Sequence, residues 1–274
     1  MSGGGTPMGA GAGPAVNEAA GRLLPEETRP VLRAFLAEAA EIFGPSLEAV
    51  ILYGSAARGE YLPGRSNLNL LLLVAAHEVG RLQRYAKAHK RWSRERIVVP
   101  LLLTRTELEA LPSLFPLECL DLVEHHLLLA GDDPFTALSP DLRRLPEQCE
   151  REVRANLLRT RQRFVEGGGT AEAALILIPL SVTSLLCCLR GLARLLDRAP
   201  AKTSDDLLDG LQDAVGLDLA PIRDALRLKR GQLTPGQCEA PRLFDRYCGA
   251  LQALAERVAR LRAEGRLGRS GAGT

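Results

Sequence analysis

The sequence predicts an α+β protein in which a mixed sheet with flanking helices is followed by an all-α helical bundle. Up to about residue 135, short apolar runs bounded by glycine and proline alternate with amphipathic segments. Beyond residue 141, long segments with helical periodicity follow, and none has the pattern of a strand. The chain has 274 residues, which is enough for two domains that each bury a core.

The two predicted domains are residues 17–140, which contain the sheet, and residues 141–265, which form the bundle. Residues 1–16 are rich in glycine and alanine, with neither a basic start nor a compact apolar segment, so they do not resemble a secretory signal. We expect these residues and residues 266–274 to be disordered tails.

The first domain begins with a helix over residues 17–43, which Gly44-Pro45 ends. The apolar run Ala49–Tyr53 predicts a buried strand, and Leu68–Val74 predicts a second strand that is buried on both faces. The third apolar run, Ile97–Leu103, contains a proline and therefore predicts an edge strand or a bulge.

Three further segments of this domain are predicted to be helical. A short helical turn is expected over Ala56–Tyr61, and longer helices over Glu78–Arg94 and Thr106–Phe115. Leu117–Leu129 is compatible with either a strand or a helix. The bundle is predicted to contain helices over Asp141–Val165, Glu172–Asp197, Ser204–Val215, Pro221–Lys229 and Arg242–Ala263.

The charge balance gives no general attraction to nucleic acid or membranes, because 35 basic residues face 33 acidic ones and the net charge is +2. We therefore do not expect nucleic acid as a partner, and a polyanion site would have to be local. The basic segment Arg81–Arg96 is either such a site or the solvated face of a helix. The six cysteines have no metal-site spacing, which favours reduced thiols in a cytoplasmic protein.

Ala173–Leu189 is uncharged and reaches the lower length limit of a membrane span. It contains Pro179 and three hydroxyl residues, and charged residues flank it on both sides. The segment therefore favours the central helix of the bundle over a membrane helix.

The turn after the first strand, Leu52-Tyr53-Gly54-Ser55, has the features of a phosphate-binding loop. A tight turn at a strand end exposes backbone N–H groups, glycine allows a phosphate to approach closely, and a serine hydroxyl adds a donor. Arg58 follows the turn and is a candidate phosphate contact, and Arg65 is a weaker one. The predicted nucleotide- or phosphate-binding residues are Gly54, Ser55 and Arg58.

The order of elements, with Gly54-Ser55 followed by Asn67-x-Asn69 on the next strand, resembles the nucleotidyltransferase superfamily of the polymerase-beta type. The trailing helical domain is similar to that of its kanamycin-nucleotidyltransferase-like members. In that family the second motif is Asp-x-Asp, and a third carboxylate lies on a later strand. The resemblance implies that these carboxylates hold two Mg²⁺ ions, which activate a hydroxyl and stabilise the departing pyrophosphate.

The sequence departs from the family pattern at all three of these positions. Asn67 and Asn69 keep the spacing of the aspartates but are neutral, and Ile97–Leu103 contains no acid. Mg²⁺ normally requires carboxylate or phosphate oxygens. We therefore expect no metal site, no cofactor and no catalysis, and a protein that binds NTP or another nucleotide, or a protein partner or second copy through its bundle.

Two alternative functions are also compatible with the sequence. One is an active transferase that moves a nucleoside monophosphate from an NTP to a small molecule, a protein or RNA, with Mg²⁺ held by other acids. The other is a structural pair of domains without a ligand. The candidate replacement residues are Glu60, Glu118, Asp121, Glu124, His125 and His126. For the group at residues 118–126, the solvated face of a helix or strand is the simpler interpretation.

Overall fold

The computed structural model describes residues 14, 17 and 24–268, and the chain divides into two compact units. The first unit extends to Glu109 and includes His125–Ala137, whereas the second comprises Ala110–Glu124 and the chain from Leu138 onward. Residues 110–124, which the sequence analysis assigns to the first domain, thus contribute to the second unit. Most residues of the two predicted tails lie outside the described part of the chain.

In the described part of the first unit, four strands form a mixed sheet with the order β3-β2-β1-β4. The central strand β1 (Leu47–Tyr53) pairs antiparallel with both β2 (Asn69–Val74) and β4 (His126–Gly131). The edge strand β3 (Leu101–Leu103) pairs in parallel with β2. The predicted mixed sheet with flanking helices is therefore confirmed.

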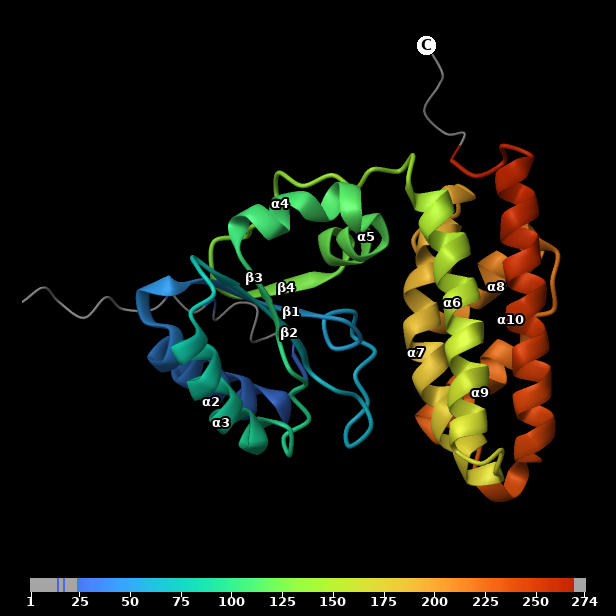
Figure 1. The fold of residues 1–274 in the computed structure, drawn as a ribbon, viewed down its shortest axis with the longest axis horizontal. Helices are drawn as coiled ribbons and strands as arrows, with labels where there is room; N and C mark the ends of the chain where they lie inside the picture. Colours follow the sequence, from blue (N-terminus) through green and yellow to red (C-terminus); the bar gives the residue numbers. More distant parts are fainter. Residues whose placement is uncertain (1–13, 15–16, 18–23, 269–274) are drawn as a thin grey trace, which may run out of the picture. The chain divides into compact units, whose positions relative to one another are not determined.

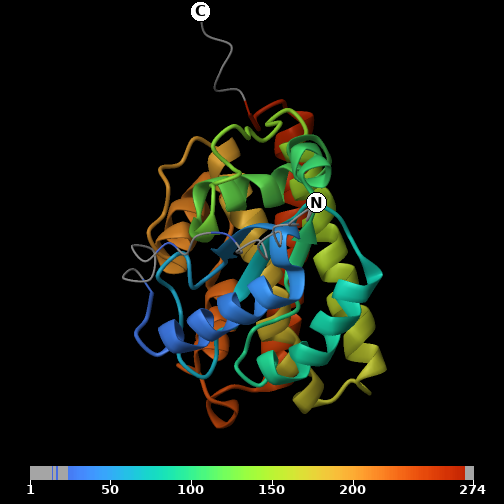
Figure 2. The ribbon, with the colours of Figure 1, turned by 90° about the vertical axis from the view of Figure 1, so that its left-hand side faces the viewer.

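Two helices, α2 (Thr28–Phe43) and α3 (Val79–Trp92), cover one face of this sheet and run side by side in Figure 2. A short 3₁₀ turn, η1 (Gly44–Ser46), joins α2 to β1. Phe35 of α2 meets the ring of Trp92 edge-on, with the ring centroids 5.4 Å apart. The core residues that the sheet contributes beneath these helices include Val50, Leu52, Leu70 and Leu72.

Several predicted boundaries differ from the structure. The first helix of the described residues, α2, begins at Thr28, because Leu24–Glu27 form a turn before it, and residues 18–23 of the prediction lie outside the described part. Ala56–Tyr61 contains no helix, since residues 54–59 form hydrogen-bonded turns. β3 is shorter than predicted because Pro100 lacks the N–H group that a strand ladder needs.

The ambiguous segment Leu117–Leu129 contains both kinds of structure. Helix α5 (Pro116–Glu124) occupies its first part, and β4 begins at His126. Helix α4 (Arg105–Leu114) precedes α5 and tolerates Pro112 within it. Because the segment changes from helix to strand, neither the helical period of 3.6 residues nor the strand period of two residues extends over its whole length.

The described residues of the second unit form helices joined by turns and loops, without a strand (Figure 1). Each helix predicted for the bundle is present. The core consists mainly of leucine, valine and alanine side chains, as the low aromatic content requires. A 3₁₀ turn, η2 (Pro235–Gln237), precedes the last helix. The long helices are α6 (Leu145–Glu166), α7 (Ala171–Leu195), α8 (Ser204–Val215), α9 (Ala220–Arg230) and α10 (Ala240–Ala263).

Among the described residues, α7 is the one helix that is long and apolar enough to cross a membrane. Within its most apolar 18-residue window, 44% of the residues are buried inside the protein. Its buried face, which includes Ile178, Val182 and Leu185, belongs to the core of the second unit. The packing of the bundle thus accounts for much of the apolar composition of α7.

Candidate functional site

The turn that follows β1 places Gly54 under two constraints. Its φ of +79° lies in the left-handed region, which side chains other than that of glycine rarely adopt. A Cβ atom at Gly54 would also lie 2.6 Å from Nδ2 of Asn69, the first residue of β2. The turn and the start of β2 are therefore packed directly against each other.

Hydrogen bonds within the turn use its carbonyl groups. The N–H of Arg58 donates to the Gly54 carbonyl at 3.2 Å, and the N–H of Glu60 donates to the Ser55 carbonyl at 2.8 Å. No backbone carbonyl among the described residues accepts a hydrogen bond from the N–H groups of Ser55, Ala56 or Ala57. Successive backbone N–H groups of this kind are characteristic of anion-binding turns.

Arg58 lies in the same turn, and its guanidinium is close to the carboxylate of Glu60. The distance from Arg58 Nε to Glu60 Oε2 is 3.8 Å, and the two side chains are only 11% and 17% exposed. Pairing partly neutralises Glu60, which is one of the candidate replacement acids. Arg65 is exposed on the following loop. The structure thus brings Gly54, Ser55 and Arg58 into one turn.

Asn67 and Asn69 stand where the resemblance implies two metal-binding aspartates. Asn69 is paired with Tyr53 across the sheet, and Asn67 is exposed two residues earlier. Between them, Leu68 donates its N–H to the Arg96 carbonyl at 2.9 Å and accepts from the Val98 N–H at 3.2 Å. The backbone beside the asparagines is therefore Arg96–Val98, which contains no carboxylate.

These residues do not fit the two-Mg²⁺ site that the resemblance implies. Mg²⁺ is a hard cation that takes carboxylate, phosphate or water oxygens in near-octahedral geometry. Asn67 and Asn69 supply neutral amides, and the adjacent backbone supplies no acid. Within the described residues, no group of three or more His, Cys, Asp or Glu side chains lies together in a way that could hold a metal ion.

Three of the candidate replacement acids lie on α5 in the second unit, where each contacts a partner on α6 or α7. Glu118 accepts a hydrogen bond from Gln148 at 2.7 Å. Asp121 pairs with Arg190 at 2.8 Å, and Glu124 lies 3.9 Å from Arg194. Burial raises the pKa of Glu124, and the nearby Arg194 opposes this effect. The contacts attach α5 to the bundle, so these acids have a structural explanation.

Both candidate histidines belong to the first unit, where His125 lies in the bend between α5 and β4 and His126 is the first residue of β4. His126 begins β4 and lies opposite Tyr53, in the same cross-strand row as Asn69. Its Nε2 atom is 3.1 Å from Asp133 Oδ2, and its ring meets Phe135 edge-on. In the sequence His126 stands next to the acids of α5, and local periodicity gives no sign that β1 pairs with β4.

The arginines of the basic segment Arg81–Arg96 pack largely against α2. Arg81 donates to the Phe43 carbonyl, and Arg84 donates to the Glu41 carbonyl at 3.2 Å. Cations at a helix C-terminus are stabilised by its exposed carbonyls and its dipole. Arg91 pairs with Glu38 at 2.5 Å. These contacts support a structural role for the segment.

Comparison with known proteins identifies the region that contains the turn. Residues 32–129 match a family model described as a nucleotidyltransferase domain. The match begins within α2 and ends within β4, so it includes β1, the Gly54-Ser55 turn and both asparagines. No curated protein matches the chain.

Proposed function

We propose, from the premise that residues 32–129 form a nucleotidyltransferase domain, that this domain binds nucleotide phosphates without catalysing metal-dependent transfer. One observation supports the proposal above all. The Gly54-Ser55 turn lies directly against Asn69, while the backbone on the other side of Asn67-x-Asn69 contains no carboxylate. The turn therefore offers N–H donors that suit an anion, at a place where asparagines stand instead of the acids that the resemblance implies.

The neutral side chains of Asn67 and Asn69 also favour phosphate binding in the absence of metal. Aspartates at these positions would repel a polyphosphate unless a cation lay between them. Asparagine removes that repulsion, and its side-chain amide can donate hydrogen bonds to phosphate oxygens. In this proposal the N–H groups of Ser55–Ala57, the Ser55 hydroxyl and the Arg58 guanidinium contact the phosphates.

The contacts of the remaining acids argue against the active alternative. Nucleotidyl transfer requires that the attacking hydroxyl be activated and that the charge on the departing pyrophosphate be stabilised. Glu60 faces Arg58, whereas Glu118 and Asp121 contact Gln148 and Arg190 within the second unit. None of these acids belongs to a group that could hold a metal ion in the described part of the chain.

A pyrophosphate-release assay tests the absence of transfer. The protein is incubated with labelled NTPs, Mg²⁺ or Mn²⁺ and a panel of small-molecule, protein and RNA acceptors. We expect no metal-dependent release of pyrophosphate. Release that disappears in the Ser55→Ala variant but persists in Ser93→Ala, which alters an exposed serine of the same domain, would overturn the proposal.

A further inference from the structure

A small polar cavity lies between α6 and α7 in the second unit. Its volume is about 40 Å³. All of its lining residues belong to the helical bundle, none belongs to the nucleotidyltransferase domain, and none is acidic. The lining consists of Asn156, Arg159, Thr160, Arg163, Leu177, Leu180, Ser181 and Ser184.

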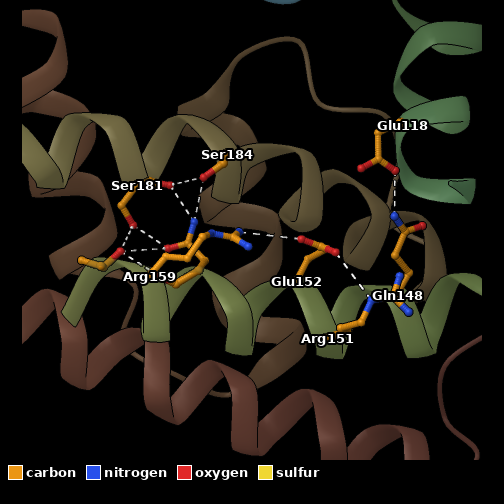
Figure 3. A network of polar contacts seen from close by, with 9 residues as sticks. Glu118, Gln148, Arg151, Glu152, Arg159, Ser181 and Ser184 are labelled. Atoms are coloured by element: carbon orange, nitrogen blue, oxygen red, sulfur yellow. Dashed lines mark hydrogen bonds and ion pairs between the residues drawn. The ribbon is translucent and has the colours of Figure 1, made fainter. Parts of the chain in front are cut away.

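The floor of the cavity is a buried network of polar side chains. Asn156 donates to the Ser181 carbonyl at 3.0 Å and to the Ser184 hydroxyl at 2.8 Å. The Thr160 and Ser181 hydroxyls are 2.9 Å apart, and the Ser181 hydroxyl is also 2.9 Å from that of Tyr247 on α10. Figure 3 shows Ser181 and Ser184 gathered near Arg159 in this network. Internal hydrogen bonds offset the cost of burying these groups.

Two arginines lie at the mouth of the cavity. Asn156, Arg159, Thr160 and Arg163 have the spacing i, i+3, i+4 and i+7, which places them on one face of α6. Arg159 lies 3.8 Å from Glu152 and is half exposed, so this ion pair is weak. No carboxylate of the described residues forms an ion pair with Arg163. The mouth is therefore positively charged.

We propose that this cavity binds one phosphoryl group, either as free phosphate or as the end of a phosphate monoester. A single water occupies about 10–15 Å³ of such a volume, so the cavity has room for roughly three oxygen atoms. A phosphoryl group has three terminal oxygens. Guanidinium groups match phosphate geometry with paired N–H donors, and the Ser184 hydroxyl can rotate to donate as well.

The hydrogen-bonded floor by itself would also serve a purely structural purpose, because it fixes α6 against α7 and α10. This structural role does not explain why Arg159 and Arg163 lie one helical turn apart, since like charges at this spacing repel each other. An anion between them removes the repulsion. Leu177 and Leu180 supply an apolar wall beside the cations, which suits the carbon portion of a monoester.

An NMR titration tests this assignment, because it follows amides 156–163 separately from amides 54–58 of the nucleotidyltransferase domain. The probes are inorganic phosphate and phenyl phosphate. The variants are Arg159→Gln/Arg163→Gln and the control Arg154→Gln, which lies on α6, pairs with Glu150 and does not line the cavity. Thermal unfolding verifies that the variants fold.

We expect at least one probe to shift amides 156–163 in the wild type and in Arg154→Gln. The double variant should bind about tenfold more weakly or worse, since charge-assisted hydrogen bonds are lost. The tighter probe then distinguishes free phosphate from a monoester. Absence of binding at amides 156–163, or equal affinity in the double variant and the control, would overturn the assignment. Shifts at amides 54–58 report on the proposed function independently.

Discussion

Gly54 has a left-handed backbone conformation and lies close to the Asn69 side chain. Mutations can separate the backbone strain from the steric overlap that an added Cβ would cause. Gly54→Ala should lose about 1–2 kcal/mol of stability from the backbone angle and about 1–3 kcal/mol more from overlap with Asn69. Gly59 has a similar φ of +74° but nothing within 4 Å of the added Cβ, so Gly59→Ala should show the first loss alone. Urea denaturation measures both variants, and equal losses would mean that Asn69 does not crowd Gly54.

Asn67 and Asn69 stand just before and at the start of β2, where the resemblance implies two metal-binding aspartates. The double change Asn67→Asp and Asn69→Asp places two carboxylates on one face of the chain, two residues apart. We expect Mg²⁺ or Mn²⁺ affinity to rise measurably in calorimetry. The control is Gln83→Glu, which adds a carboxylate at an exposed position of α3 and for which no such rise is expected. An unchanged affinity in the double variant would show that the two residues do not line a metal site.

Glu107 gives the stability of the first unit a specific acid dependence. Hydrogen bonds from Thr104 and His77 lower the pKa of Glu107 from 4.5 to about 2. A lowered carboxyl pKa stabilises the folded state fully above pH 4.5, and this contribution is lost as the pH falls from 4.5 through about 2. Because the side chain is exposed, the contribution should be about 1 kcal/mol or less.

Urea denaturation at neutral pH and near the lower pKa tests this dependence. Glu107→Gln should be less stable than the wild type at neutral pH, and its stability should fall less on acidification. Glu109→Gln is the control, because Glu109 is an exposed glutamate on the same helix. If Glu107→Gln and the wild type lost equal stability in acid, the hydrogen bonds to Glu107 would not be important.

At the scale of elements, α5 and α7 approach each other closely at Gly191. A Cβ atom there would lie 2.3 Å from Leu117 Cδ2 and 3.3 Å from Cys149 Sγ, and both neighbours are buried. Gly191→Ala should therefore destabilise the protein by about 1–3 kcal/mol through overpacking. Gly210 in α8 has nothing within 4 Å, so Gly210→Ala should instead stabilise it by about 0.5–1 kcal/mol.

Thermal or chemical unfolding of both glycine variants measures this difference in sign. A stabilised Gly191→Ala variant would show that α5 does not lie this close to α7. The same contact explains why residues 110–124 belong to the second unit, since Leu117 is part of the core of the bundle. Leu117 and Gly191 are far apart in the sequence, so local sequence cannot reveal their contact.

The long elements could be predicted because their information is local. Ser204–Val215 was predicted with the bounds of α8, where Thr203 and Asp206 form a capping box and Gly216 ends the helix in the left-handed conformation. The predicted start of β3 was wrong because Pro100 interrupts the strand pairing. The predicted start of α2 was wrong because a turn precedes Thr28. Strand order and the pairing of β1 with β4 depend on contacts far apart in the chain.

The site was predictable to a similar extent. The turn, its glycine and the two asparagines are visible in the sequence, and the structure places Gly54, Ser55, Arg58 and Asn69 around one turn. The position of His126 beside Tyr53 follows only from the sheet. The cavity between α6 and α7 likewise depends on which faces of the two helices pack together, which local periodicity does not specify.

For the whole molecule, the central claim is that the domain binds nucleotide phosphates independently of a divalent cation. Calorimetric titration of the full chain with ATP, in EDTA and then with Mg²⁺, tests it most directly. We predict binding in EDTA that is not strengthened by Mg²⁺, and an affinity about threefold to tenfold lower in Ser55→Ala, which lacks one phosphate donor. Binding that occurs only with Mg²⁺ present would contradict the claim.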